Sequence, residues 1–92
     1  MTKHDTAGLY YAVYLFPSAL ESLGEAIAPY LREGPHGKHL LCAEIDAGGG
    51  LFEITIPSHD AEGRPLDVEV MFPASMVRLV VSTRPEAELG FT

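Results

Sequence analysis

Two stretches carry residue types that catalysis or phosphate binding often uses. Ser58, His59 and Asp60 supply the side chains of a hydrolase triad, but a triad needs one imidazole to contact both partners from its opposite ring nitrogens. Adjacent residues cannot meet in that way, and we interpret this polar stretch as a turn. The glycines of 48–50 lack the Lys-Ser/Thr pair and the following helix of a phosphate-binding loop, so they also predict a turn.

His36, His39 and Cys42 are spaced three residues apart, which raises the question of a metal site. On a strand, residues three apart point to opposite faces, so the side chains of His39 and Cys42 should diverge. The lone Cys42 cannot form an internal disulfide and is best interpreted as a small buried apolar side chain. The sequence therefore predicts no metal site, no cofactor and no catalytic residue.

A second hypothesis, of a different class, is a small enzyme or ligand-binding protein. It would use His36, His39 or His59 together with nearby carboxylates. It requires a deep pocket lined by two of these histidines and a carboxylate, whereas histidines scattered over the surface would exclude it.

The composition restricts the class of partner. With 92 residues, 47% apolar and 21% charged, the chain fits a single domain spanning 1–92, with residues 1–8 frayed. Thirteen acidic and six basic residues give a net charge of −7, which disfavours nucleic acid and anionic membranes. No apolar run approaches the ~20 residues of a membrane span. We expect a cytoplasmic protein whose partner is a protein or peptide.

Residues 9–16, LYYAVYLF, predict a strand that ends at Pro17. Both faces are apolar, which is typical of a strand near a sheet centre or at an interface; the alternative for so short a run is a first helical turn. Its tyrosines, Tyr10, Tyr11 and Tyr14, are the candidate binding residues, as part of an interface or of a sheet edge.

The clearest local signal is that of a helix. Ser18 and Glu21 have the spacing of a capping box. Gly24 weakens the helix and Pro29 should kink or end it, so we expect a helix over 18–28 with a distorted last turn. Its apolar stripe consists of Leu20, Leu23, Ile27 and Leu31.

Residues 38–46 and 51–57 predict a hairpin joined by the glycine turn, because apolar and polar residues alternate along both segments. The outer row, with Glu44, Asp46 and Glu53, suits solvent. The predicted buried row consists of Leu41, Ala43, Ile45, Phe52, Ile54 and Ile56.

Two strands joined by a bend or a single helical turn form the most apolar part of the chain. Residues 66–72 alternate as a half-buried strand, and residues 76–81 continue as a second one. Arg78 is the one charge in this second run, and we expect it on the outer face, paired with Asp67 or Glu69.

Two parts of the chain resemble the SspB (stringent starvation protein B) adaptors. GPHGKHLLCAEID, after the predicted helix, resembles the turn and first strand that follow that family's amino-terminal helix. LFEITIP, RPLDVEVMFPASMVRLVVS and PEAELGF are similar to its closing strands, so the resemblance covers more than half of the chain. It implies a helix on a Sm-like, partly open β-barrel, in a dimer that holds degradation tags in a groove and delivers them to the ClpXP protease.

This chain departs from the family pattern in three places. Only the short AGGG turn stands where the family has further strands, the strand 9–16 is additional, and the 92 residues include no counterpart of the tail by which the adaptors contact the protease. No tag-binding residue is carried over from the family.

We therefore predict an α+β fold, with the helix packed on a small antiparallel Sm-like/SspB-like curled sheet or partly open barrel and the N-terminal strand as an extra element. The later strands should form a four-stranded meander. The predicted function is non-catalytic, adaptor-like binding of an extended peptide at a sheet edge, by a homodimer whose interface includes the tyrosine strand or the helix. A Sm-like RNA binder is the third possibility, which the acidity disfavours.

Overall fold

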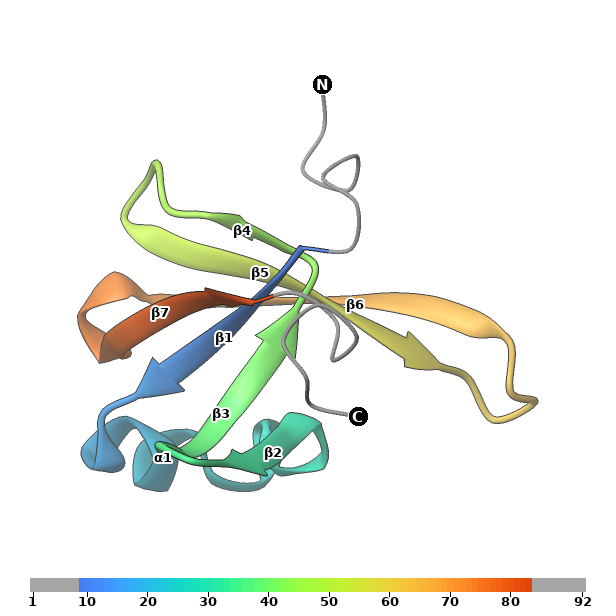
Figure 1. The fold of residues 1–92 in the computed structure, drawn as a ribbon, viewed down its shortest axis with the longest axis horizontal. Helices are drawn as coiled ribbons and strands as arrows, with labels where there is room; N and C mark the ends of the chain where they lie inside the picture. The colour runs from blue at the N-terminus through green and yellow to red at the C-terminus, as the bar shows by residue number, and fades with distance from the viewer. Residues whose placement is uncertain (1–8, 84–92) are drawn as a thin grey trace.

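Residues 9–83, which a computed structural model describes, fold into two antiparallel sheets and one short α-helix (Figure 1). The predicted α+β class is confirmed. The expected fraying of residues 1–8 and the last segment of the family resemblance, PEAELGF, lie outside the described residues. The strands are β1 (Tyr10–Leu15), β2 (Leu31–Gly34), β3 (Gly37–Cys42), β4 (Glu44–Asp46), β5 (Leu51–His59), β6 (Pro65–Pro73) and β7 (Val77–Thr83).

Sheet A has the strand order β2-β3-β1-β7, and sheet B has the order β4-β5-β6. The predicted strand at 9–16 is β1, and the helical alternative for this segment is wrong. β1 pairs with β3 on one side and with β7 on the other, so it is an interior strand. Val13 and Leu15 lie in the core, whereas Tyr10 and Tyr14 belong to the opposite row of the strand.

The helix α1 (Pro17–Leu23) is shorter than predicted. Pro17 occupies its first turn, where a missing amide is harmless, and Phe16 is the N-cap, so Ser18 is inside the helix and the predicted capping box is wrong. Gly24, with φ 54°, ends the helix in the left-handed region that glycine tolerates best. Two 3₁₀ turns, Gly24–Ala26 and Ala28–Tyr30, then lead into β2.

The apolar side of this helical segment closes one end of the core. Ala19 and Ile27 are buried, at 4% and 3% exposure. The other members of the predicted stripe, Leu20, Leu23 and Leu31, are partly buried and pack against the same cluster. The stripe is therefore confirmed, although α1 itself ends before Ile27.

A single residue, Ala43, carries the chain from sheet A into sheet B. The Ala43 amide donates to the Thr55 carbonyl oxygen at 2.8 Å, which attaches β4 to β5 directly after β3 has paired with β1. The bend changes which residues face inward: Leu40 and Cys42 are fully buried in β3. The predicted burial of Leu41 in the inner row is thus wrong, because the prediction assumed one straight strand.

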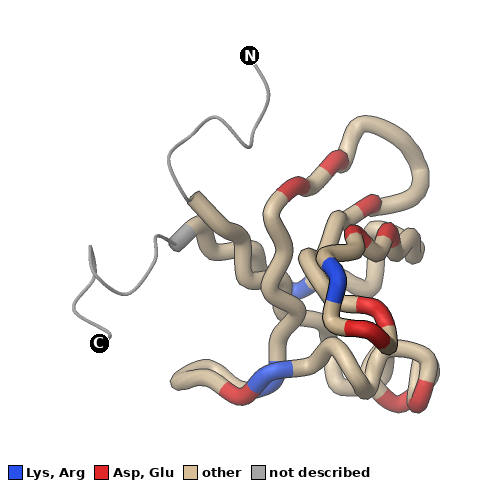
Figure 2. The backbone as a smooth tube through the Cα atoms, turned by 90° about the vertical axis from the view of Figure 1, so that its right-hand side faces the viewer, with Lys and Arg blue, Asp and Glu red and all other residues tan. Residues whose placement is uncertain are grey.

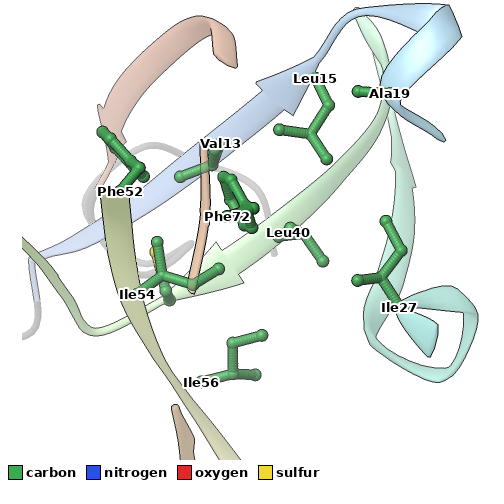
Figure 3. Close-up of a cluster of buried hydrophobic side chains, with 10 residues drawn as sticks. Val13, Leu15, Ala19, Ile27, Leu40, Phe52, Ile54, Ile56 and Phe72 are labelled. Atoms are coloured by element: carbon green, nitrogen blue, oxygen red, sulfur yellow. The ribbon is translucent and has the colours of Figure 1, made fainter. Parts of the chain in front are cut away.

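Sheet B supplies the larger apolar side chains of the core. The predicted row Phe52, Ile54 and Ile56 is confirmed, and the Phe52 ring stacks on Phe72 of β6 with centroids 5.9 Å apart. Figure 3 shows these side chains facing those of β1, β3 and α1.

Burial along β6 rises towards the carboxyl end of the strand. Phe72 is 2% exposed and Val70 packs against the core, but Leu66 is 47% exposed. The far end of the β5–β6 hairpin extends beyond the rest of the fold, which is why Leu66 does not reach the core (Figure 1). The predicted alternation holds, and the predicted burial of Leu66 is wrong.

The predicted single helical turn after β6 is the 3₁₀ turn Ala74–Met76, fixed by a 3.0 Å hydrogen bond from the Phe16 amide to the Met76 carbonyl oxygen. β7 then pairs with β1 and not with β6, so the expected four-stranded meander ends at β6. Among residues 9–83, no helix is long and apolar enough to cross a membrane.

Candidate functional site

The most unusual surface is the outer face of sheet A, the side turned away from the core. Its residues follow from the strand registers, because directly paired residues point to the same side of a sheet. Its outward positions are Tyr10, Ala12, Tyr14, Arg32, His39, Leu41, Leu79 and Val81.

Tyr14 lies at the centre of one end of this face, and its side chain is covered from three directions. The His39 ring lies 5.2 Å from the Tyr14 ring, centroid to centroid, and the His36 ring lies 6.0 Å away in an edge-on arrangement. The Arg78 guanidinium carbon lies 5.8 Å from the same ring centroid. These four residues, named the Tyr14 cluster below, leave Tyr14 only 4% exposed.

A β-bulge places Arg78 in this cluster. Tyr14 pairs with Leu79, but the next residue, Leu15, pairs with Val77, so Arg78 is the extra residue on β7. A bulge redirects the side chain of the extra residue and lets two neighbouring residues point to the same side. Arg78 therefore joins Leu79 on the outer face, above the Tyr14 ring, where a cation is attracted by the ring electrons.

The two glycines of the β2–β3 turn have different tasks, and it is Gly34 that makes room for His39. Gly37 has φ 106°, which a residue with a side chain rarely adopts, and it closes the two-residue turn against Gly34. The His39 ring lies so close to Gly34 that a Cβ there would sit 2.8 Å from its Cε1 atom. The contact of His39 with Tyr14 thus depends on the absence of a side chain at position 34.

The outer face of sheet A carries no acidic residue at any described position, although the chain has thirteen acids. Arg32 pairs with His39 in register, so its side chain belongs to the same face. Neither Arg32 nor Arg78 forms an ion pair with any residue in 9–83. This face is therefore a cationic region on an acidic protein.

The outer face of sheet B has the opposite character, as predicted for its polar row. Asp46 lies directly opposite Glu53, and acidic positions follow both strands around the 47–50 turn (Figure 2). A shallow depression there is lined by side chains that include Glu44 and Glu69. Within residues 9–83, no group of three potential metal ligands is close enough to hold an ion.

The four edge strands differ in how well they are guarded against pairing. Natural sheets protect exposed edges with short strands, charges and prolines. β2 and β4 are four and three residues long, and β6 begins and ends with proline and carries Asp67 and Glu69. β7 has seven residues, VRLVVST, without a proline or an acid, and its outward Leu79 and Val81 are 39% and 37% exposed.

The candidate binding tyrosines are therefore divided between two sides of an interior strand. Tyr11 packs against the core, and its carbonyl oxygen accepts a weak hydrogen bond from Cys42 Sγ at 3.4 Å. Tyr10 and Tyr14 belong to the outer face of sheet A. None of the three is on a sheet edge, because β1 is paired on both sides.

The residues considered for chemistry do not form a catalytic arrangement. Cys42 lies in the core and His39 on the outer face, so they diverge as predicted. Burial raises the pKa of the Cys42 thiol to about 12, which keeps it protonated and unreactive. His36 and His39 do lie together, but no described carboxylate belongs to the Tyr14 cluster, and His59 lies at the end of β5 in the other sheet.

Asp60 next to His59 has a structural task. Its Oδ1 atom accepts hydrogen bonds from the Arg64 and Glu62 amides, both at 2.9 Å, and its Oδ2 atom accepts one from Arg64 Nε at 3.0 Å. These hydrogen bonds hold the pKa of the Asp60 carboxyl below its usual range, and the bond from the Arg64 amide has the largest effect. The turn thus begins at Asp60, whereas Ser58 and His59 are the last residues of β5, paired with Leu66 and Pro65 of β6. The prediction that Ser58 and His59 belong to the turn is therefore wrong, because β5 extends two residues further than expected.

Sequence reasoning missed the Tyr14 cluster. Arg78 was expected to pair with Asp67 or Glu69, which is wrong because the bulge directs it across β1 instead of towards β6. The available signals were the glycines at 34 and 37 and the lone arginine in an apolar strand. They do not reveal which strand lies beside β7, and the cluster depends on that pairing.

A scan against protein-family models and searches of curated proteins and of solved structures found no match to this chain, so its own geometry and charges carry the inference of a role.

Proposed function

We propose that this chain is a non-catalytic protein-binding module that accepts an extended segment of a partner as an added strand along β7. The observation that carries the proposal is the long free edge of β7, which beyond Arg78 has no charge or proline, with Leu79 and Val81 exposed on the adjoining outer face. In this type of recognition, main-chain hydrogen bonds supply affinity and alternate side chains supply specificity.

Exposed aliphatic side chains beside a free strand edge indicate a binding surface, because leaving them uncovered carries a risk of aggregation. An unpaired apolar strand is a hazard for aggregation unless it is short, charged or covered. The other three described edges are short or carry prolines and acids, whereas β7 has only Arg78 and its bulge, which lie near one end and leave Leu79–Thr83 unprotected. A partner strand on β7 would satisfy its free backbone groups and cover Leu79 and Val81 in one step.

The finer details of the fold are part of the same proposal. We infer that the two sheets form one curled, partly open barrel of Sm-like or SspB-like type, open between β6 and β7. The passage of the chain from β3 into β4 at Ala43, together with the order β7-β1-β3 and β4-β5-β6, supports this inference. An adaptor-like role follows from the same resemblance. The cytoplasm is part of the proposal because the free, buried Cys42 is compatible with a reducing compartment.

A homodimer, also expected from the resemblance, would use the same edge or the outer face of sheet A. Light scattering after size-exclusion chromatography at tens of micromolar measures the mass directly. A dimer whose mass falls to that of a monomer in Leu79→Asp supports a second copy on β7. A monomer leaves the edge free for another protein.

The test of the proposed function is selection of peptides from a displayed random library by the biotinylated chain. We expect enriched extended apolar sequences whose capture is lost in Leu79→Asp. Met71→Asp is the matched control, because Met71 is 52% exposed but lies on the guarded strand β6. Circular dichroism confirms that both variants are folded. The proposal fails if nothing is enriched, or if both variants lose capture equally.

A further inference from the structure

We propose that the segment accepted by β7 carries an acidic side chain that pairs with Arg78. This inference rests on the proposed function, since it specifies the chemistry of the segment. It makes the Tyr14 cluster the subsite for a carboxylate and the Leu79–Val81 part of the face the subsite for apolar side chains.

The charges around Arg78 favour a carboxylate from outside the chain. The guanidinium offers five donors, and no carboxylate in residues 9–83 pairs with it. Arg32 on β2 belongs to the same face, and the rings of His36 and His39 lie against Tyr14 with no described acid among them. An acid placed here meets two arginines and no like charge at a described position, on a protein that elsewhere repels acids.

The Tyr14 ring fixes where the carboxylate should bind. By holding the guanidinium 5.8 Å from its centroid, it reduces the freedom of a long exposed side chain before any partner arrives. The bulge keeps Arg78 on the outer face, next to Leu79. A partner thus meets a positioned cation directly beside an apolar row.

Strand direction gives the order of side chains in the segment. Every pair of strands in sheet A is antiparallel, and antiparallel pairing is the more stable kind per residue. An antiparallel segment meets Val81 first and Leu79 two residues later. Its next outward side chain, two residues further on, lies opposite Val77 and therefore beside the outward-pointing Arg78. We therefore expect two apolar residues in alternate positions, followed two residues later by Asp or Glu.

A second copy that pairs through its own β7 supplies no such acid. β7 itself, VRLVVST, contains none. If two β7 strands paired about Val80, Arg78 would lie opposite Ser82, and the guanidinium would remain without a carboxylate. A different protein with an acidic, apolar segment fits the face better.

The experiment is an NMR titration of the ¹⁵N-labelled chain with the peptide Val-Thr-Val-Thr-Glu-Thr, acetylated and amidated. Two further probes replace Glu by Gln, one amidated and one with a free terminal carboxylate. The protein is studied as wild type, as Arg78→Gln, and as Lys38→Gln, which removes a cation from β3 on the row opposite to His39. Amide shifts in β7 report binding at this edge and give a dissociation constant even for weak complexes.

We expect the Glu peptide to bind wild type and Lys38→Gln about fivefold more tightly than the amidated Gln peptide, an advantage that Arg78→Gln abolishes. Equal binding of the two amidated peptides at β7 would overturn the acidic pairing and leave the proposed function standing. A free-acid Gln peptide as tight as the Glu peptide would also overturn it, in favour of a chain end. If no peptide shifts the β7 amides, both this inference and strand addition fail.

Discussion

The guanidinium carbon of Arg78 lies 5.8 Å from the centroid of the Tyr14 ring. A bulge in β7 makes this contact possible, because it turns the Arg78 side chain onto the outer face of sheet A, whereas regular alternation would point it to the opposite face from Leu79. This contact joins the apolar and the basic parts of that face. Because no acid occupies this face at any position in residues 9–83, an acidic chain presents a cationic surface here. The relationship has consequences for stability as well as for binding.

Replacing Arg78 by glutamine should lower the free energy of unfolding by about 0.5–1 kcal/mol, the usual size of a cation–aromatic contact at an exposed site. Tyr14→Phe keeps an aromatic ring below the guanidinium and should preserve the effect of the arginine. Urea denaturation of the wild type, of Arg78→Gln, of Tyr14→Phe and of the double variant measures the effect of the arginine above each ring. If Arg78→Gln destabilises no more than Lys38→Gln, the contact contributes nothing.

Gly34→Ala should displace the His39 ring from Tyr14. A Cβ at position 34 would sit 2.8 Å from His39 Cε1, which is closer than real contacts allow, and the ring is the part free to move. Ring protons of His39 and Tyr14 should therefore change their NMR shifts. Gly49→Ala is the control, since nothing lies within 4 Å of a Cβ there. Unchanged shifts in Gly34→Ala would mean that His39 does not lie against this glycine.

Truncation along β6 tests the burial gradient. Phe72 is 2% exposed and stacks on Phe52, so Phe72→Ala should lower the free energy of unfolding by about 3–5 kcal/mol. Leu66 is 47% exposed on the same row of the strand, so Leu66→Ala should lower the free energy of unfolding by less than about 1 kcal/mol. Thermal or urea unfolding gives both values. Similar losses at the two positions would contradict the described position of the hairpin end.

Cys42 should resist alkylation until the protein unfolds. Its pKa of about 12 leaves almost no thiolate at pH 8, so iodoacetamide should label it only in denaturant. Because the folded pKa lies above the ordinary 9.0, the unfolded thiol ionises first. Its contribution to stability is therefore complete below pH 9 and is lost as the pH rises towards 12.

The comparison with Cys42→Ala isolates this alkaline effect. The stability of wild type relative to the variant should fall between pH 9 and pH 12, the range between the two pKa values. Rapid labelling of the native protein at pH 8, or an unchanged stability difference over that range, would show that the thiol is not enclosed.

The strands were predictable where a residue's environment follows from its own alternation. Phe52, Ile54 and Ile56 sit on a straight strand beside a local hairpin, so period-two patterning identified the buried row. The turn after β6 and the burial of Cys42 were predictable for similar local reasons. These features needed no knowledge of which distant strands pair.

The errors arose where tertiary structure decides. Because the helix begins at Pro17, Phe16 is its N-cap and Ser18 lies inside the first turn. Gly24 then ends the helix before the predicted apolar stripe is complete. The bend at Ala43 divides the expected strand into β3 of sheet A and β4 of sheet B, so Leu40 and Cys42 face the core in β3 where Leu41 was expected. The Tyr14 cluster joins a turn and three strands through a bulge, and no local pattern specifies such a register.

Hydrogen exchange of the β7 backbone amides tests the central claim most directly, because it asks whether this strand has an open edge. One side of β7 is bonded to β1, and no described strand pairs with the other. We predict that amides alternate along β7, those facing β1 exchanging slowly and those facing outward exchanging fast, and that a bound peptide protects the fast set. Uniform slow exchange in the free chain would mean that the edge is already occupied and would contradict this account.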